Sequence, residues 1–173
     1  AEEVARSDAA PRAEESASGD ERPSRLRITP SDSNRHVLVV EDDPTSQLIV
    51  CSILQDAGCL TSTADNGAQA LELLSRETFD LVLMDWQMPD MDGLEVTRRL
   101  RRGTVGEFGT LVPIIALTAN DFAEDRAACF AAGMNGFVTK PVQAKALIAA
   151  VTCWLRPSEN AELAPSSGFA VQT

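Results

Sequence analysis

Short apolar runs alternate along the middle of the chain with longer segments in which apolar residues recur at helical spacing. The runs lie at residues 36–40 (HVLVV), 59–64 (CLTSTA), 81–84 (LVLM), 113–117 (PIIAL) and 136–138 (GFV). Runs of this length that are largely apolar and β-branched are typical of strands buried in a parallel sheet. The pattern therefore predicts five strands, each followed by a helix.

The segments between the runs predict helices, because their apolar residues can share one face. The first helix is expected from Thr45 to Ala57, and the third begins at Asp92, since Asp92 and Glu95 have capping-box spacing. The apolar residues expected to share a face are Ile49, Val50, Ile53 and Leu54; Ala70, Leu71 and Leu74; Ala123, Ala127, Phe130 and Ala131; and Leu147, Ala150, Val151 and Trp154. Five βα units in succession predict a single α/β domain, a five-stranded parallel sheet doubly wound with helices on both faces.

Composition divides the chain into three parts. Residues 1–35 are rich in Glu, Ser, Arg, Ala and Pro and carry almost no large apolar side chains. Such a segment cannot bury enough surface to offset its ordering entropy, so a disordered linker is expected there. Residues 157–173 have a similar composition and are expected to form a disordered tail. One compact domain is expected between them, at residues 36–156.

Charge and cysteine content restrict the class of function. The formal net charge is −11, whereas a nucleic-acid-binding protein normally has a basic face. Cys51, Cys59, Cys129 and Cys153 form no C-x-x-C pair and have no histidine cluster beside them, so buried, reduced thiols are expected rather than zinc ligands. No apolar run is long enough to span a membrane. We expect a cytoplasmic domain without direct membrane contact. The option that a longer parent protein is anchored at the inner membrane stays open.

Polar residues follow four of the predicted strands, at the edge of the sheet where open parallel sheets bind their ligands. They are Glu41, Asp42 and Asp43 after the first run, Asp85 after the third, Thr118 after the fourth, and Thr139 and Lys140 after the fifth. Asp43 precedes Pro44 and has the features of a helix N-cap. Helix capping does not explain the presence of Glu41 and Asp42. Adjacent acids at the end of a buried strand repel one another unless a cation is present, and hard oxygen ligands suit Mg²⁺.

Asp85 comes too early to cap the helix that begins at Asp92. A carboxylate at the end of a central strand can attack phosphorus, because it is already deprotonated at neutral pH. Phosphoryl transfer depends mostly on positioning and on charge neutralisation. Mg²⁺ held by Asp42 and Asp85, the ammonium of Lys140 and the hydroxyl of Thr118 would supply both.

Four blocks, VLVVEDDP, LVLMDWQMPDMDG, PIIALTAN and GFVTKP, resemble in order and spacing the motifs of bacterial response-regulator receiver domains. The resemblance implies a flavodoxin-like fold over roughly residues 36–156. It implies that Asp85 accepts the phosphoryl group, with Mg²⁺ bound directly by Asp42, through water by Glu41, and by the backbone carbonyl of Gln87.

The same resemblance assigns roles around the phosphoryl group. Thr118 and Lys140 would hold its oxygens and move toward it, which would free space beside Phe137, the position of the switching aromatic. Phe137 lacks the hydroxyl of the tyrosine often found there. Gln87 and Asn120 would tune the lifetime of the acyl phosphate.

The blocks most resemble receivers of hybrid sensor histidine kinases, so the C-terminal receiver of such a kinase is the first expectation. The only histidine, His36, starts a strand. The donor would therefore be a phosphohistidine on a histidine kinase or a phosphotransfer domain, and the isolated domain would catalyse only its own phosphorylation and dephosphorylation. A weak dimer through the fourth helix, fifth strand and fifth helix is a further option.

Other functions stay open. The domain could be a stand-alone response regulator or a docking adaptor that works without phosphorylation. An aspartate-based phosphatase would need a second acid where Gln87 stands, and a nucleotide-binding domain would need a Gly-rich loop after the first strand. One departure from the family pattern is segment 101–113, which is long and Gly-rich for the connection after the third helix.

Overall fold

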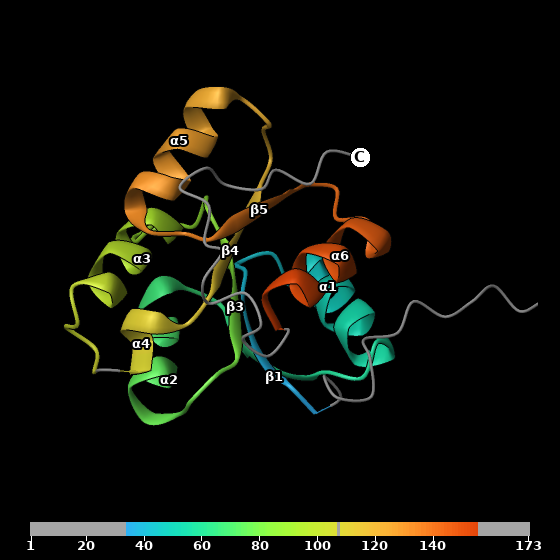
Figure 1. Ribbon diagram of the computed structural model, residues 1–173, viewed down its shortest axis with the longest axis horizontal. Coiled ribbons are helices and arrows are strands. Elements are labelled where there is room, and N and C mark those ends of the chain that lie inside the picture. Colours follow the sequence, from blue (N-terminus) through green and yellow to red (C-terminus); the bar gives the residue numbers. More distant parts are fainter. Residues whose placement is uncertain (1–33, 107, 156–173) are drawn as a thin grey trace, which may run out of the picture.

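A five-stranded parallel sheet with strand order β2-β1-β3-β4-β5 organises the protein (Figure 1). The computed structural model describes residues 34–106 and 108–155. The strands are β1 (His36–Val40), β2 (Leu60–Ala64), β3 (Leu81–Asp85), β4 (Ile114–Thr118) and β5 (Gly136–Thr139). Each predicted run forms a strand, with bounds that differ by at most one residue at either end. The predicted linker at 1–35 and tail at 157–173 lie largely outside the described residues.

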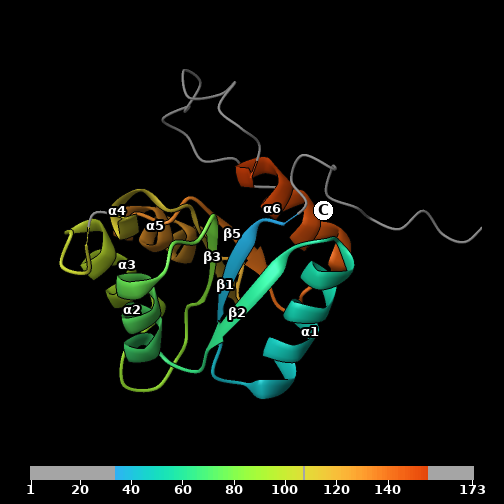
Figure 2. The ribbon, with the colours of Figure 1, turned by 90° about the horizontal axis from the view of Figure 1, so that it is seen from below.

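Helices cover both faces of the sheet, which confirms the doubly wound architecture. The helices are α1 (Pro44–Asp56), α2 (Gly67–Arg76), α3 (Gly93–Arg101), α4 (Phe108–Leu111), α5 (Ala123–Ala132) and α6 (Ala144–Leu155). Figure 2 shows the sheet nearly edge-on, with α1 and α6 on one side and α2, α3, α4 and α5 on the other. Within the described residues, no helix is long and apolar enough to cross a membrane.

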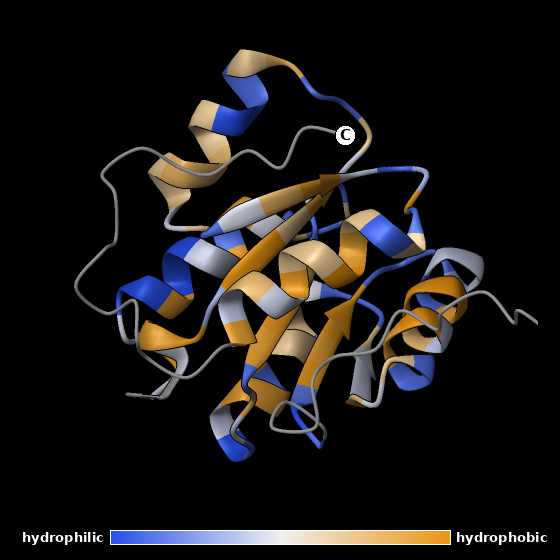
Figure 3. Ribbon diagram, turned by 45° about the vertical axis from the view of Figure 1, so that its right-hand side comes forward, coloured by the Kyte–Doolittle hydropathy of each residue, from blue (hydrophilic) through white to orange (hydrophobic). Residues whose placement is uncertain are grey.

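Alternate residues of the central strands feed two separate apolar layers. In β1, Val37 and Val39 pack toward α1 and α6, whereas Leu38 and Val40 pack toward α2 and α3. Both sets are fully buried, which is why this strand reads as an unbroken apolar run rather than an alternating one. In Figure 3, where colour follows hydropathy, the central strands are mostly orange between helices of mixed colour.

The predicted apolar face of α5 is wrong. Ala123, Ala127 and Ala131 are exposed, whereas Cys129 and Ala132 are buried against the sheet. Alanine buries little apolar surface, so a row of alanines does not determine which side of a helix packs inward. Cys129, which packs as a small apolar residue, lies on the buried side of the helix together with Ala132.

Smaller departures concern single side chains. Val50 and Leu54 of α1 are buried as predicted, but Ile49 is exposed. Trp154, expected in the core, is 40% exposed, and Cys153 is exposed although a buried thiol was expected. These residues lie at the edges of the buried stripes, where periodicity alone does not define burial.

Two caps position the helices that flank the edge of the sheet where the acids lie. Asp43 accepts hydrogen bonds from the backbone N–H groups of Thr45 and Ser46, at 3.1 and 3.3 Å, as expected for an N-cap. Asp92 accepts one from the N–H of Glu95 at 2.7 Å. The Glu95 carboxylate pairs with Arg99 on the solvent side, so only the Asp92 half of the expected capping box is seen.

The segment between α3 and β4 contains the short helix α4, which periodicity did not predict. Arg101 anchors this segment: its guanidinium donates to the carbonyl oxygens of Gly109, Thr110 and Gly133 and to Asn135 Oδ1. Asn135 Oδ1 also accepts from the N–H of Ile114, at the start of β4. The long connection is thereby tied to the turn between α5 and β5.

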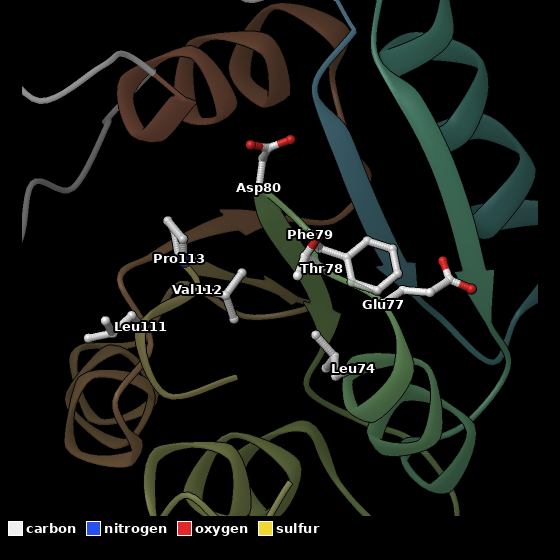
Figure 4. Close-up of a pocket in the computed structure, with 8 residues that line it drawn as sticks. All are labelled: Leu74, Glu77, Thr78, Phe79, Asp80, Leu111, Val112 and Pro113. Atoms are coloured by element: carbon white, nitrogen blue, oxygen red, sulfur yellow. The ribbon is translucent and has the colours of Figure 1, made fainter. Parts of the chain in front are cut away.

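A cavity of about 310 Å³ lies beside this segment. Figure 4 shows Val112 and Pro113 on one side of it and Leu74 and Phe79 on the other. Asp80 and Pro113 immediately precede β3 and β4, so the cavity opens at the amino-terminal edge of the sheet. The acidic residues described next lie at the opposite edge.

Candidate functional site

Three carboxylates converge at the carboxyl ends of β1 and β3. Glu41 and Asp42 follow β1 and Asp85 ends β3, and these two strands are hydrogen-bonded neighbours. One ligand oxygen from each residue lies within 4.8 Å of the others. Glu41 and Asp85 are buried, while Asp42 is exposed. The sheet topology therefore brings together the acids that the sequence predicted as metal ligands.

Lys140 reaches the same cluster from the end of β5. Its Nζ lies 2.9 and 2.8 Å from the two carboxylate oxygens of Glu41 and 3.0 Å from Asp85 Oδ2. Burial lowers the pKa of Lys140, but hydrogen bonds to Glu41 and Asp85 raise it by more, so the net shift is upward. The side chain is therefore a fixed positive charge between two buried acids.

Glu41 retains its proton more strongly than an ordinary glutamate. Burial, with a smaller contribution from the charge of Asp85, raises the pKa of Glu41 to about 7, while Lys140 opposes the shift. Its Oε2 is buried and has no partner with hydrogen-bond geometry, although the ammonium lies 2.8 Å away. Lys140 pairs with both Glu41 and Asp85, so the ammonium offsets only part of the cost of a charged Glu41 in this buried position.

This cluster fits a divalent cation. The candidate ligands are hard carboxylate oxygens without cysteine or histidine among them, which suits Mg²⁺ better than zinc or copper. The buried Glu41 oxygen without a hydrogen bond is a further acceptor that a cation or its water shell would satisfy. Asp42 on the exposed side leaves the site open to solvent and to a substrate.

Thr118 and Gln87 lie beside the cluster. Thr118 is buried at the end of β4, next to β3, and its carbonyl accepts the N–H of Lys140 at 2.7 Å. The Thr118 hydroxyl donates to the carbonyl of Asn120 at 2.9 Å and accepts the N–H of Asn120 at 3.2 Å. The N–H of Gln87 donates to Asp85 Oδ1 at 3.2 Å. The predicted metal contact of the Gln87 carbonyl stays a prediction.

Phe137 lies on β5, away from the acids, and packs at the edge of the layer beneath α5. The guanidinium carbon of Arg126 lies 4.9 Å from the centre of its ring, and Phe130 meets the ring edge-on at 6.5 Å. Arg126 also forms an ion pair with Asp121, in the loop that follows β4. Neither Arg126 nor Asp121 was predicted to matter, because an exposed Asp–Arg pair five residues apart has no distinctive sequence signal.

The sheet order and the acid–lysine cluster together define a class of protein. Residues 37–152 match the family described as response regulator receiver domain, and the chain belongs to this family. It is therefore a receiver domain of two-component signalling, as the four sequence blocks predicted.

The individual similarities refine this result. The chain is 39% identical over 136 residues to the sensor histidine kinase GacS of Pseudomonas protegens, which covers 76% of this chain but 15% of GacS. It is 42% identical over 112 residues to an uncharacterized 14.6 kDa protein of Leptolyngbya boryana, covering 65% of this chain and 83% of that protein.

Among solved structures, the chain resembles the receiver domain of the sensor histidine kinase PA1611 of Pseudomonas aeruginosa. The TM-score is 0.65 at 36% identity, covering 71% of this chain and 98% of that one. That receiver was solved with a magnesium ion coordinated in its active-site cleft.

Proposed function

We propose that Asp85 accepts a phosphoryl group from a phosphohistidine in the presence of Mg²⁺, and that this modification is the signal. The observation that carries the proposal is the environment of Asp85: a buried carboxylate at the end of a central strand, 3.0 Å from an ammonium and beside two further acids. With Mg²⁺ held by these acids and the ammonium beside it, the carboxylate can attack an anionic phosphoryl group, because the two positive charges offset the repulsion.

The metal would be held by Asp42 and Asp85 directly, by Glu41 through water and by the backbone carbonyl of Gln87. When bound, Mg²⁺ supplies positive charge to the phosphoryl oxygens. The magnesium ion in the cleft of the PA1611 receiver supports this choice of metal. Without the metal, Glu41 holds a proton more strongly than an ordinary glutamate, because its pKa is raised to about 7.

The reacting carboxylate oxygen must be free to form a bond to phosphorus. Among the residues that the structure describes, Asp85 Oδ1 accepts the N–H of Gln87, whereas Oδ2 faces Lys140. As the bond to phosphorus forms, the bond from phosphorus to the donor imidazole breaks, and the carboxylate loses its charge. Because Asp85 is then no longer ionised, its ion pair with Lys140 is lost, and the ammonium can turn to a phosphoryl oxygen.

Thr118 must rearrange as well. Its hydroxyl has one proton, which now serves the carbonyl of Asn120. Donation to a phosphoryl oxygen therefore requires that this bond open. Both Thr118 and Lys140 are thus side chains whose partners change between the two states.

The donor would lie on another domain or another protein. His36, the only histidine of the chain, has its ring nitrogen Nε2 2.8 Å from Ser62 Oγ and packs against Phe79, far from the acids in the sheet. We propose a C-terminal receiver of a hybrid sensor histidine kinase, because kinases such as GacS contain a similar segment as part of a longer chain. A weak dimer through α5, β5 and α6 also stays a proposal.

A second candidate is a stand-alone response regulator. The similarity to a 14.6 kDa protein, of which 83% is covered, supports it. Phosphotransfer from a panel of purified kinase and phosphotransfer domains would separate the two candidates. Fastest transfer from a kinase core that belongs to the same protein as this receiver favours the hybrid kinase. Fastest transfer from a separate histidine kinase favours the stand-alone regulator.

Intact mass after incubation with Mg²⁺ and acetyl phosphate tests the central step. We expect one phosphoryl adduct that is labile to base, is lost when Mg²⁺ is removed and is absent from Asp85→Asn. Asp90→Asn is the matched control, because Asp90 is exposed and asparagine tolerates its positive φ of 69° equally well. A normal adduct in Asp85→Asn refutes the assignment, and an unmodified wild-type protein that still binds its partner favours the docking adaptor.

A further inference from the structure

The ring of Phe137 is held by two side chains of α5. Phe130 meets it edge-on at 6.5 Å, and the guanidinium of Arg126 lies 4.9 Å from its centre. The positive charge of a guanidinium is attracted to the face of an aromatic ring. Phe137 has no hydroxyl, so this contact, and not a hydrogen bond, is the polar interaction that defines its position.

Arg126 is in turn oriented by the loop between β4 and α5. Its Nε donates to Asp121 Oδ1 at 2.7 Å, and Nη2 contacts the same oxygen. Asp121 directly follows Asn120, whose carbonyl and N–H are both bonded to the Thr118 hydroxyl. A continuous series of contacts therefore runs from Thr118 through residues 120 and 121 to Arg126 and the ring of Phe137.

The Thr118 hydroxyl cannot serve both ends of this series once Asp85 is modified. With a single proton, it donates either to the carbonyl of Asn120 or to a phosphoryl oxygen. The second choice breaks the bond to the Asn120 carbonyl, one of the two hydrogen bonds that join Thr118 to Asn120, and so loosens the loop at the neighbouring Asp121. The arrangement seen here, with Thr118 bonded to Asn120, is consequently the one that lacks a phosphoryl group.

We propose that Asp121 and Arg126 form a latch that holds Phe137 in the unphosphorylated arrangement and that is released when Thr118 turns to the phosphoryl group on Asp85. The latch rests on the proposed function of Asp85. Arg126 is a positioning residue, since it touches neither the acids nor Thr118. Opening the latch by mutation favours the phosphorylated arrangement, because a ligand of that arrangement binds more tightly when it is already populated.

Affinity for beryllofluoride, a stable phosphoryl analogue, tests the latch. Binding to the full chain with Mg²⁺ is followed by fluorescence of Trp86, next to Asp85, in a Trp154→Phe background that leaves one tryptophan. We expect Arg126→Ala to tighten binding about threefold to tenfold, from the size of one ring–guanidinium contact and one exposed ion pair. Asp121→Asn should also tighten binding. The double variant, with Asp121→Asn and Arg126→Ala, should bind beryllofluoride no more tightly than Arg126→Ala alone.

Arg99→Ala is the matched control, since Arg99 also forms an exposed ion pair, with Glu95 at 2.8 Å, but on α3. It should leave the affinity unchanged, and the gain from Arg126→Ala should vanish in a Phe137→Leu background. A merely structural role of Arg126 would weaken binding, not tighten it. Unchanged or weaker binding in Arg126→Ala, or an equal gain in Arg99→Ala, overturns the latch while leaving the proposed function intact. Failure of the wild type to bind beryllofluoride overturns both.

Discussion

Gly93 tests how closely the start of α3 must approach the strand that ends in Asp85. Its N–H donates to the carbonyl of Trp86 at 3.0 Å. A Cβ at this position would lie 2.2 Å from the backbone oxygen of Asp85 and 2.8 Å from Met84 Cγ. The first of these atoms belongs to the central strand and cannot turn aside as a side chain can. The start of α3 would have to move instead.

The expected size of the effect follows from this distance. Ordinary van der Waals contacts of a Cβ begin at 3.4 Å, so Gly93→Ala requires a displacement of about 1 Å. Overpacking of this kind lowers the free energy of unfolding by about 1–3 kcal/mol, and we expect a value near the upper end of that range. For a domain of this size the melting temperature should fall by about 10 °C. The displaced segment includes Trp86 and Gln87, which adjoin Asp85. A shift of that size at a reacting group can lower the rate of phosphorylation by up to about 100-fold.

Gly67→Ala is the matched comparison. Its Cβ would lie 2.6 Å from Val96 Cγ2, a side-chain atom between α2 and α3. We expect this variant to lose stability but to retain its Mg²⁺ affinity and its rate of phosphorylation by acetyl phosphate. Thermal unfolding, Mg²⁺ titration and the initial rate would be measured on both. If Gly93→Ala phosphorylates at the wild-type rate, or Gly67→Ala loses as much activity as Gly93→Ala, the close approach does not support the site.

Three further predictions concern residues outside the acid cluster. Arg101→Ala should destabilise the protein by about 3 kcal/mol in denaturant unfolding, because four oxygens lose a charged donor; a loss below about 0.5 kcal/mol contradicts the anchoring role. Iodoacetamide should label only Cys153 in the native protein, as read by mass spectrometry, since the other three thiols are buried; a second native label contradicts this. Burial, aided by Asp125, raises the pKa of Cys129 from 9.0 to about 11, so the folded state keeps a proton that the unfolded state loses, and stability should decline as pH rises from about 9 to 11. Cys129→Ala should flatten that decline, and an unchanged slope would show that another group causes it.

The predicted site follows from the sequence because of topology. In a parallel sheet all strands end at one edge, so Glu41, Asp85 and Lys140 need only follow predicted strands to be brought together. Lys140 and Glu41 are 99 residues apart, yet their side chains meet. No side-chain conformation had to be known for that conclusion. The flavodoxin-like arrangement of the strands, by contrast, was implied by the resemblance to receiver domains and not by the hydrophobic pattern.

What could not be predicted depends on amounts of buried surface and on side-chain orientation. The orientation of α5 was wrong because its alanines give too weak a signal, and α4 has four residues, too few for a periodic pattern. Glu95 was expected to complete a capping box but pairs with Arg99, since two cationic residues on the next turn compete for it. In each case the outcome depends on side-chain packing and pairing, which periodicity and spacing do not describe.

The roles assigned to Lys140 and Thr118 show a different limit. Sequence resemblance gives each residue one role, as a partner of the phosphoryl group. In the structure both are already engaged, Lys140 by Glu41 and Asp85 and Thr118 by Asn120. In the proposed reaction, the Lys140 ammonium would neutralise two acids beforehand and a phosphoryl group afterwards, so it would change partner without changing charge. The Thr118 hydroxyl, with one proton, would likewise have to leave one acceptor for another. Under this proposal, the difference in free energy between the two arrangements would depend on the competing acceptors, Glu41 and the Asn120 carbonyl, as much as on the phosphoryl group. Those acceptors become visible only when the fold places them.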